Sequence, residues 1–415
     1  MYKRINKCRI CSNTALVPVI DVGEQYLTGI FSKSRSTETI TKGPLTLVKC
    51  HGGDNCCGLL QLWHSYDLNE LYGDNYGYRS SLNPSMVGHL RRKVEGIIDK
   101  CDLNKGDLVV DIGSNDGTTL SAYPKNLQLV GIDPTGEKFR SYYDKHIDLI
   151  PEFFSSDLIS SSFPEKKAKV VTSLSMFYDL ENPIDFAWQV ADILDPYEGI
   201  WLLEQSYMPL MLDRTAYDTI CHEHLEYYGL KQIVWLMDEV GLEVLDVELN
   251  DVNGGSFSVV VTHQGSKHDD VSNAVHWCIA SEDSKRLSNL EPYKMFARRT
   301  EENKHSLQDF VKQAKREGKR ICGLGASTKG NVILQYCGFG TEEIEVIGDV
   351  NKDKYGALTP GTWIPIEAEE KVLETNPDYL IVLPWHFKDF FVKSSSYKNR
   401  NLVFPLPSLE TIIPR

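Results

Sequence analysis

Five of the ten cysteines of the chain lie within its first 57 residues, a clustering typical of metal ligation. The pair Cys8 and Cys11 has the Cys-x2-Cys spacing, in which two thiolates wrap one side of a tetrahedral zinc ion. Two further ligands are needed, and they follow about forty residues later. Four protein ligands leave no open position for water, so the sequence predicts a structural zinc site. The predicted ligands are Cys8, Cys11, Cys50 and Cys57, and the alternatives for the last are Cys56 and His51.

A polar glycine turn is the second candidate site. Residues 108–112 (LVVDI) predict a buried strand, residues 113–117 (GSNDG) predict a turn, and Thr118 is expected to start a helix. A second predicted strand ends at Asp133, whose carboxylate can accept hydrogen bonds from both hydroxyls of a ribose. The turn lacks the third glycine of a dinucleotide fingerprint and carries polar side chains instead. It therefore favours S-adenosylmethionine over a pyrophosphate.

A second glycine turn lies in the last third of the chain, within residues 320–330 (RICGLGASTKG). It follows a short apolar segment and precedes a predicted helix, so its amide groups can bind a phosphate that Lys329 also reaches. The next predicted strand ends at Asp349, in the same relation as Asp133 to the first turn. Taken alone, this second turn suits NAD.

The elements between these sites predict an α/β protein. Helices are expected over residues 84–100 and 283–317, and further strands over residues 129–133, 168–174, 199–204, 344–349 and 379–385. We expect a Rossmann-like class I methyltransferase core, flanked by a small zinc-binding module and a second Rossmann-like domain. The expected boundaries are 1–75 for the zinc module, 76–280 for the methyltransferase domain and 281–415 for the second Rossmann-like domain.

Composition narrows the classes of partner. The chain has 415 residues, 41% of them apolar and 25% charged, which is ordinary for a globular protein with several cores. A formal net charge of -14, without a basic run, argues against binding of nucleic acid. No apolar run of about 18 residues occurs and the N-terminus does not read as a signal peptide, so we expect a cytoplasmic protein that does not contact a membrane.

The motifs together resemble the sugar C-methyltransferase family of deoxysugar pathways, over essentially the full chain. The resemblance depends on Cys8-x2-Cys11 and on the segments 57–62 (CGLLQL), 111–117 (DIGSNDG), 218–228 (DTICHEHLEYY) and 360–366 (PGTWIPI). It implies a zinc-binding domain, an S-adenosylmethionine-dependent methyltransferase domain and a C-terminal nucleotide-binding domain. It also implies a nucleotide-diphosphate 4-keto sugar as substrate, methylated at carbon 3. We expect a monomer or a weak homodimer.

Methylation beside a ketone requires a base that removes a proton from carbon and donors that stabilise the enolate oxygen. By resemblance, His224 is the general base, and Glu223 orients it or contacts the sugar. His222 is expected to point elsewhere, because adjacent side chains do not share a face. The alternatives are a pair of core histidines and a second metal site.

Resemblance also assigns further residues. Tyr76 and Tyr78 lie in a tyrosine-rich segment that covers the active site in the family. The expected cofactor-binding residues are Asp111, Gly113, Ser114, Asn115, Asp116, Asp133 and Ser175. The expected substrate-binding residues are His222, Asn253, Ser256, Gly325, Ser327, Lys329, Asp349 and Trp385.

The chain departs from the family pattern at four places. Cys221 replaces the tyrosine that usually precedes His-Glu-His, which removes a phenol donor. Asp179, a further candidate catalytic residue, occupies a position where the family often has histidine. Asn253 is the first residue of a segment whose usual family sequence is His-Gly-Gly-Ser-Leu-Arg. His386 replaces an asparagine after Trp385. The sugar and the acceptor atom are therefore the least determined part of the hypothesis.

Two other functions are kept as alternatives. A two-Rossmann oxidoreductase would carry bound nicotinamide, and a non-catalytic S-adenosylmethionine sensor would keep every activity when His224 is replaced. A methyltransferase acting on oxygen, or on another position of a nucleotide sugar, is the nearest alternative.

Overall fold

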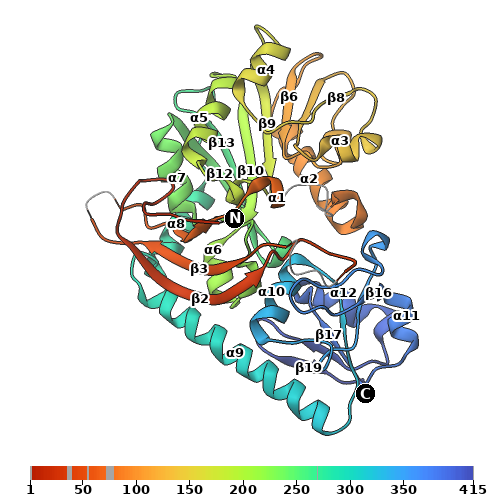
Figure 1. The fold of residues 1–415 in the computed structure, drawn as a ribbon. Helices are drawn as coiled ribbons and strands as arrows, with labels where there is room; N and C mark the ends of the chain where they lie inside the picture. The colour runs from red at the N-terminus through yellow and green to blue at the C-terminus, as the bar shows by residue number, and fades with distance from the viewer. Residues whose placement is uncertain (1, 35–39, 54–55, 72–78, 269, 415) are drawn as a thin grey trace.

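The computed structural model describes residues 2–34, 40–53, 56–71, 79–268 and 270–414. Three units meet in it: N-terminal strands, drawn in red, lie between a large α/β unit (orange to green) and a second α/β unit (blue) (Figure 1). The predicted α/β class, with a second α/β unit after the first, is confirmed.

The large unit is built on a seven-stranded sheet of order β12-β13-β10-β9-β6-β7-β8. Strands β10, β9, β6, β7 and β8 are parallel, and β13 pairs antiparallel with both β10 and β12. The carboxyl ends of the parallel strands therefore meet at one edge, where α/β sheets bind ligands. The strands are β6 (Leu108–Ile112), β7 (Gln128–Ile132), β8 (Ile147–Ile150), β9 (Ala168–Leu174), β10 (Ile200–Ser206), β12 (Leu242–Asn250) and β13 (Ser256–His263).

Helices cover both faces of this sheet because its strands alternate apolar side chains between two cores. Val109 packs in one core with Val94 and Ile97 of α2, whereas Val110 packs in the other with Val190 and Ile233. Asn83 caps α2 by accepting from the Ser85 amide at 3.0 Å. The helices are α2 (Pro84–Lys100), α3 (Gly136–Phe139), α4 (Ser156–Ser162), α5 (Pro183–Ile193), α6 (Met208–Asp213), α7 (Leu230–Glu239) and α8 (Asn273–Ser284).

The helix expected to start at Thr118 does not form. One turn of 3-10 helix, η2 (Leu120–Ala122), follows the glycine turn instead. Pro124 disfavours helical backbone at the residue before it, and β7 begins only four residues later, at Gln128. The expected helix was therefore wrong, although the strand and turn before it were placed correctly.

The N-terminal unit is an antiparallel sheet of order β11-β4-β3-β2. Its strand β11 comes from the large unit and immediately follows the His-Glu-His segment, so this segment is tied to the N-terminal sheet. The elements are β1 (Lys3–Arg4), β2 (Leu16–Tyr26), β3 (Lys42–Cys50), β4 (Leu60–Leu62), β5 (His64–Ser65), α1 (Leu68–Leu71) and β11 (Glu226–Tyr227).

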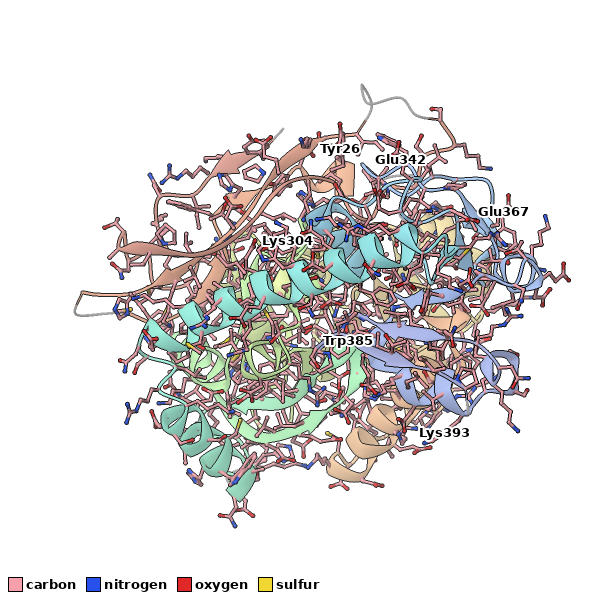
Figure 2. All side chains as sticks on the ribbon, turned by 90° about the horizontal axis from the view of Figure 1, so that it is seen from below. Tyr26, Lys304, Glu342, Glu367, Trp385 and Lys393 are labelled. Atoms are coloured by element: carbon pink, nitrogen blue, oxygen red, sulfur yellow. The ribbon has the colours of Figure 1, made fainter. Side chains whose placement is uncertain are left out.

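The C-terminal unit has a six-stranded sheet of order β16-β15-β14-β17-β18-β19, parallel except for β19. Helix α9 (Glu291–Arg316) leads into it and runs below β2 (Figure 1), and Trp385 lies near the middle of the view in Figure 2. The other elements are β14 (Ile321–Leu324), α10 (Thr328–Cys337), β15 (Ile347–Asp349), β16 (Ile366–Ala368), α11 (Glu369–Glu374), β17 (Tyr379–Val382), α12 (Lys388–Lys393), β18 (Leu402–Phe404) and β19 (Glu410–Ile412). Among the described residues, none of the helices has the length and apolar character needed to cross a bilayer.

Candidate functional site

The four predicted zinc ligands lie together. The sulfur atoms of Cys8, Cys11, Cys50 and Cys57 are all within 4.8 Å of one another. The Cys8–Cys57 and Cys11–Cys50 sulfur distances are both 3.5 Å. Zinc–sulfur bonds of about 2.3 Å in tetrahedral geometry place sulfur atoms about 3.8 Å apart, so the cluster fits this ion. Cys56 bonds the carbonyl of Cys50 and lies outside the set, in agreement with the preference for Cys57.

Amide groups donate to the sulfur atoms of this cluster. Gln61 Nε2 donates to Cys8 at 3.1 Å, Asn13 Nδ2 to Cys50 at 3.3 Å and the Leu59 amide to Cys57 at 3.4 Å. Such donors offset the negative charge of four thiolates and fix their orientation. Sequence analysis did not identify Asn13 and Gln61, because only the ligands follow a recognisable spacing.

The first glycine turn closes on Asp133 at the carboxyl edge of the large sheet. The Asn115 amide donates to Asp133 Oδ2 at 2.8 Å, and the Thr135 amide donates to Oδ1 at 2.7 Å. Asn115 has a positive φ of 51°, and Gly113 and Gly117 have φ of 74° and 75°, so three left-handed residues shape the turn. The Thr135 hydroxyl also donates to Asp133 Oδ1, at 2.5 Å. A carboxylate has about four acceptor positions, so Asp133 keeps capacity for about one ligand hydroxyl.

Segment 79–82 lies against this turn from the side of α2. The Ser80 amide donates to Asn115 Oδ1 and the Ser81 amide to Asp116 Oδ2, each at 3.0 Å. Tyr143 contributes from the other side, since its hydroxyl bonds Ser114 Oγ and the carbonyl of Asn115, each at 2.8 Å. Tyr143 was not identified from the sequence, because no motif marks a tyrosine ten residues after the second strand.

Two predicted cofactor residues have mainly supporting roles. The Asp111 carboxyl group is buried in the sheet, where it accepts from the Thr172 hydroxyl of β9. Burial, and secondarily the charge of Asp133, raise the pKa of Asp111 to about 7. Ser175 follows β9 in a left-handed conformation, with φ of 57°, and its amide donates to the Glu204 carbonyl at 2.7 Å.

His224 is presented with a defined tautomer. Its Nδ1 lies 2.9 Å from the carbonyl oxygen of Thr219, which can only accept, so Nδ1 carries the proton and Nε2 holds the free lone pair. Tyr178 packs on the ring, with centroids 4.3 Å apart. Burial of the ring, together with the nearby Lys329 ammonium, lowers the pKa of His224 to about 3. The ring is therefore neutral at physiological pH, as a base must be.

The two neighbours of His224 in the motif point to different surroundings. His222 is fully buried and packs edge-on against Tyr66 at 4.6 Å, among residues of the N-terminal unit. Glu223 instead lies beside Gly29 and close to the C-terminal unit. A Cβ atom added to Gly29 would lie 2.6 Å from Glu223 Oε1 and 3.6 Å from Thr328 Oγ1, so the side chains of Glu223 and Thr328 approach the same point. The expectation that His222 points away from His224 agrees with this placement, whereas its assignment to the substrate gains no support.

Residues of the C-terminal unit complete the surroundings of His224. Trp385 Nε1 donates to the buried carboxyl group of Asp218 at 2.8 Å. Burial raises the pKa of Asp218, and the nearby Lys329 ammonium opposes that rise. Burial, and secondarily the same ammonium, lower the pKa of His224 and of His386. Asp218 Oδ1, Glu223 Oε2 and His386 Nδ1 are among the buried polar atoms that have no hydrogen-bond partner in the described part of the chain. Unsatisfied buried polar atoms contributed by two units are typical of a polar ligand-binding site.

The second glycine turn repeats the arrangement of the first. The Ala326 amide donates to Asp349 Oδ2 at 2.7 Å, and Ser327 caps α10 by accepting from the Gly330 amide at 3.0 Å. Gly325 has a φ of 80°, and a Cβ atom there would lie 2.6 Å from the ring of Pro384. The cation at this turn is Lys354, which donates to the Ala326 carbonyl at 2.6 Å.

Asn253 and Ser256 belong to a turn that the large unit sends toward Trp385. Ser256 uses its hydroxyl within the turn, bonding the Val252 carbonyl at 2.8 Å. The carbonyl of Asn253 accepts from Lys329 Nζ at 2.7 Å. Gly254 packs closely against Trp385, because a Cβ atom added to this glycine would lie 3.3 Å from the indole ring. Asn253 therefore contributes its backbone to the site.

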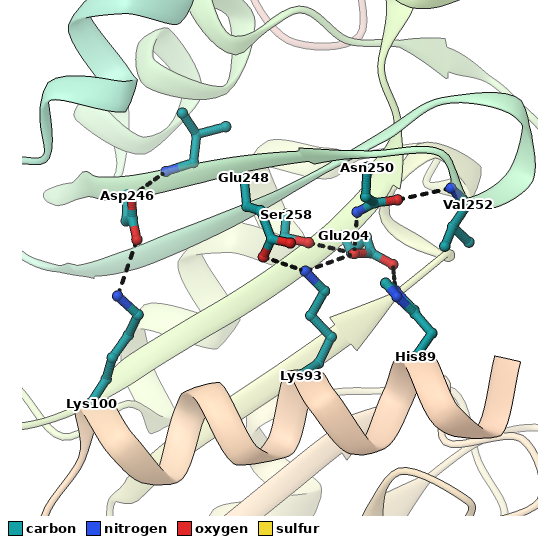
Figure 3. Close-up of polar contacts among 10 residues, drawn as sticks. His89, Lys93, Lys100, Glu204, Asp246, Glu248, Asn250, Val252 and Ser258 are labelled. Carbon is teal, nitrogen blue, oxygen red and sulfur yellow. Dashed lines mark hydrogen bonds and ion pairs between the residues drawn. The ribbon is translucent and has the colours of Figure 1, made fainter. Parts of the chain in front are cut away.

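A buried ionic network supports this turn from below (Figure 3). Glu204, at the end of β10, bonds His89 Nε2 at 2.5 Å and Asn250 Nδ2 at 2.9 Å, and Lys93 Nζ lies 3.4 Å away. Asn250 Oδ1 in turn accepts from the Val252 amide at 3.0 Å. The network joins α2, β10 and β12 to the turn that holds Lys329.

The structure describes only one of the three remaining candidate catalytic residues. Tyr76 and Tyr78 lie outside the described residues. Asp179 lies in the same region as the motif, since its charge raises the pKa of the buried Cys221 thiol, after burial and Glu223. Sequence analysis missed Asp218, Thr219 and Gly29. Asp218 is the first residue of a motif from which the sequence analysis assigned roles only to His222, Glu223 and His224. Thr219 contributes its backbone carbonyl, and Gly29 leaves space for Glu223 because it has no side chain, and neither contribution depends on a recognisable residue type.

Three family models match the chain in succession. Residues 8–72 match a domain described as "Putative zinc binding domain", residues 86–247 a "Methyltransferase domain" and residues 251–407 a "C-methyltransferase C-terminal domain". Among characterised proteins, the C-methyltransferase NovU of Streptomyces niveus is 29% identical over 418 residues, covering 99% of this chain and 98% of NovU.

Solved structures of methyltransferases match part of the chain more distantly. Magnesium protoporphyrin IX methyltransferase of Synechocystis, solved with bound S-adenosylmethionine, is 13% identical, with a TM-score of 0.33 over 48% of this chain and 89% of its own. A match to the complex of the Trm112 methyltransferase activator of Haloferax volcanii with a methyltransferase has 17% identity and a TM-score of 0.35, over 43% of this chain and 93% of that one.

Proposed function

Since this chain is an S-adenosylmethionine-dependent methyltransferase that carries the C-methyltransferase C-terminal domain and a zinc-binding domain, we propose that it methylates carbon 3 of a nucleotide-linked 4-keto sugar. The observation that carries the proposal is the place of His224. The Thr219 carbonyl holds its Nδ1, and Asp218, Glu223 and His386, which come from both α/β units, each carry an unsatisfied polar atom. A small polar substrate held by the C-terminal unit would reach the base there.

The chemistry divides between the residues of this site. The proton on carbon 3 passes to His224 Nε2, and the electron pair of the broken C–H bond forms an enolate with the neighbouring carbonyl group. S-adenosylmethionine, when bound, supplies an electrophilic methyl group, which the enolate carbon takes. Thr219 holds the ring of His224 so that its lone pair faces the substrate. Glu223 and Asp218 offer acceptors to the hydroxyl groups of the sugar.

The two glycine turns serve two ligands in this proposal. The turn that closes on Asp133 holds the ribose of the cofactor, and the turn that closes on Asp349 holds the nucleotide of the sugar. Asp133 and Asp349 each accept from a backbone amide of their own turn. An alanine variant at one of the two positions is therefore a matched control for an alanine variant at the other.

Replacing Asp133 by alanine is expected to weaken binding of S-adenosylhomocysteine at least tenfold, because about 2 kcal/mol of charge-assisted hydrogen bonding is lost. Asp349→Ala should leave that affinity within about twofold and instead weaken binding of a nucleoside diphosphate. Titration calorimetry of both variants with both ligands gives the answer. Equal losses in both variants would mean that the carboxylates only shape their turns.

The acceptor atom is tested with a panel of nucleotide 4-keto sugars. Mass spectrometry and NMR of the product are expected to place the new methyl group on carbon 3. A methyl group on oxygen would remove the enolate step from the proposal. Bound nicotinamide in the purified protein, seen by absorbance, would favour an oxidoreductase instead.

A further inference from the structure

The site contains a buried cation whose place differs from that expected at a phosphate turn. Lys329 follows the second glycine turn, but its ammonium group reaches across to the large unit and donates to the Asn253 carbonyl at 2.7 Å. An ammonium group has three N–H donors, and within the described residues the Asn253 carbonyl accepts from one of those of Lys329. Lys354 is the lysine that bonds the turn itself, at the Ala326 carbonyl.

The position of Lys329 is fixed from both units. Asn253 has a left-handed backbone, with φ of 54° and ψ of 22°, and this conformation presents its carbonyl to the lysine. The chain before it is held by Asn250, which bonds both the Val252 amide and the buried Glu204 (Figure 3). The carboxyl group of Asp218, held by Trp385, provides a countercharge close by.

The proposed reaction needs a cation at this place. Removal of a proton from carbon beside a ketone moves a full negative charge toward the carbonyl oxygen, and the site already contains the acidic groups of Glu223 and Asp218. Cys221, which precedes His-Glu-His, is a fully buried thiol and a poor donor. His386 is neutral at physiological pH, because burial and the lysine lower its pKa to about 3.

We propose that Lys329 is a catalytic residue that stabilises the enolate oxygen with its free N–H donors, rather than a ligand of the nucleotide phosphates. The inference rests on the proposed function. As the carbon 3 proton moves to His224 Nε2, the carbonyl oxygen gains negative charge and Lys329 donates to it. When the enolate carbon takes the methyl group and the carbonyl reforms, the charge leaves the oxygen, and His224 releases its proton to water. The methyl donor departs as the neutral thioether.

The test compares Lys329→Met with Lys329→Arg. The methionine variant removes the charge and keeps most of the side-chain volume, whereas arginine keeps the charge at a displaced position. Lys304→Met is the matched control, because Lys304 lies on α9, over the ring of Tyr336 at 4.3 Å, and its loss changes the net charge equally. Binding of S-adenosylhomocysteine and the melting temperature establish that each variant is folded.

Three quantities are measured in each variant: kcat, the rate at which deuterium from the solvent enters carbon 3 with S-adenosylhomocysteine bound, and the Kd for the nucleoside diphosphate alone. In Lys329→Met we expect kcat and the exchange rate to fall about 10²- to 10³-fold, the usual effect of losing one oxyanion donor. The Kd for the diphosphate should stay within about twofold, and Lys329→Arg should retain an intermediate activity. Lys304→Met should match the wild type in all three quantities.

The pH profile gives an independent readout. The lysine charge is one cause of the lowered pKa of His224, so its removal raises that pKa toward the ordinary value. Because the base works only when neutral, the acid limb of kcat/KM should move to higher pH in Lys329→Met.

Other outcomes overturn the assignment. A diphosphate Kd that rises tenfold or more, with exchange at the wild-type rate, would make Lys329 a phosphate ligand. If the exchange rate, the diphosphate Kd and the acid limb of kcat/KM all keep their wild-type values in Lys329→Met, Lys329 has only a structural role. If the wild-type enzyme itself neither exchanges nor methylates any sugar of the panel, the proposed function fails, and the inference fails with it.

Discussion

His224→Ala is expected to lower methyl transfer by about 10²- to 10⁴-fold, the usual contribution of a general base, while both ligands still bind. The reason is the fixed tautomer: the Thr219 carbonyl occupies Nδ1, and Nε2 is left as the acceptor for a proton. Deuterium exchange at carbon 3, with S-adenosylhomocysteine bound, measures the proton step without the methyl step. Exchange should be lost in the alanine variant together with turnover.

His222→Ala is the internal control for this experiment. Its ring is fully buried against Tyr66, so its removal leaves a cavity that costs on the order of 2 kcal/mol of stability. It should therefore lower the melting temperature and leave the exchange rate of the folded protein nearly unchanged. Exchange that persists in the His224 variant would place the base elsewhere, with Asp179 or a tyrosine at 76 or 78 as the next candidate.

Strands β6, β7, β9 and β10 of the central sheet were predictable because each is a short, mainly apolar segment bounded by polar turns, whereas β8, β12 and β13 were not predicted. Residues 108–112 and 168–174 form strands over the predicted ranges, and Pro84–Lys100 is the predicted helix. The helix after the first turn was not predictable from Thr118 and Thr119, because Pro124 and the early start of β7 decided the local structure. Local patterns predict elements well when no nearby residue competes with them.

The site was predictable in its motifs and unpredictable in its contacts. Cysteine spacing predicted the four metal ligands, and the two strand-ending aspartates each accept from a backbone amide of their glycine turn. The partner of Lys329 is a backbone carbonyl 76 positions away, in another unit. Such a contact depends on how the units pack and on one left-handed residue, and neither leaves a pattern in the sequence. A lysine after a glycine turn was therefore interpreted as a phosphate ligand.

The adjacent cysteines of the zinc cluster allow a sharp test of the metal site. Cys57 Sγ lies 3.5 Å from Cys8 Sγ inside the four-sulfur set, whereas Cys56 bonds the Cys50 carbonyl beside it. Elemental analysis should therefore find one zinc per chain in the wild type and in Cys56→Ser, and none in Cys57→Ser. Zinc retained by Cys57→Ser, or lost from Cys56→Ser, would contradict the assignment.

Loss of the metal is expected to unfold the N-terminal unit, since structural zinc contributes about 10 to 16 kcal/mol to small domains of this kind. The effect should extend to the active site, because β11, which begins two residues after His224, pairs with β4 of the N-terminal sheet. Chelation should thus lower the melting temperature and the fraction of active molecules together, and added zinc should restore both. The rate per active molecule should not change, because four thiolate ligands leave no coordination position for a substrate. Metal-free protein with the stability of the wild type would show that the cluster does not depend on zinc.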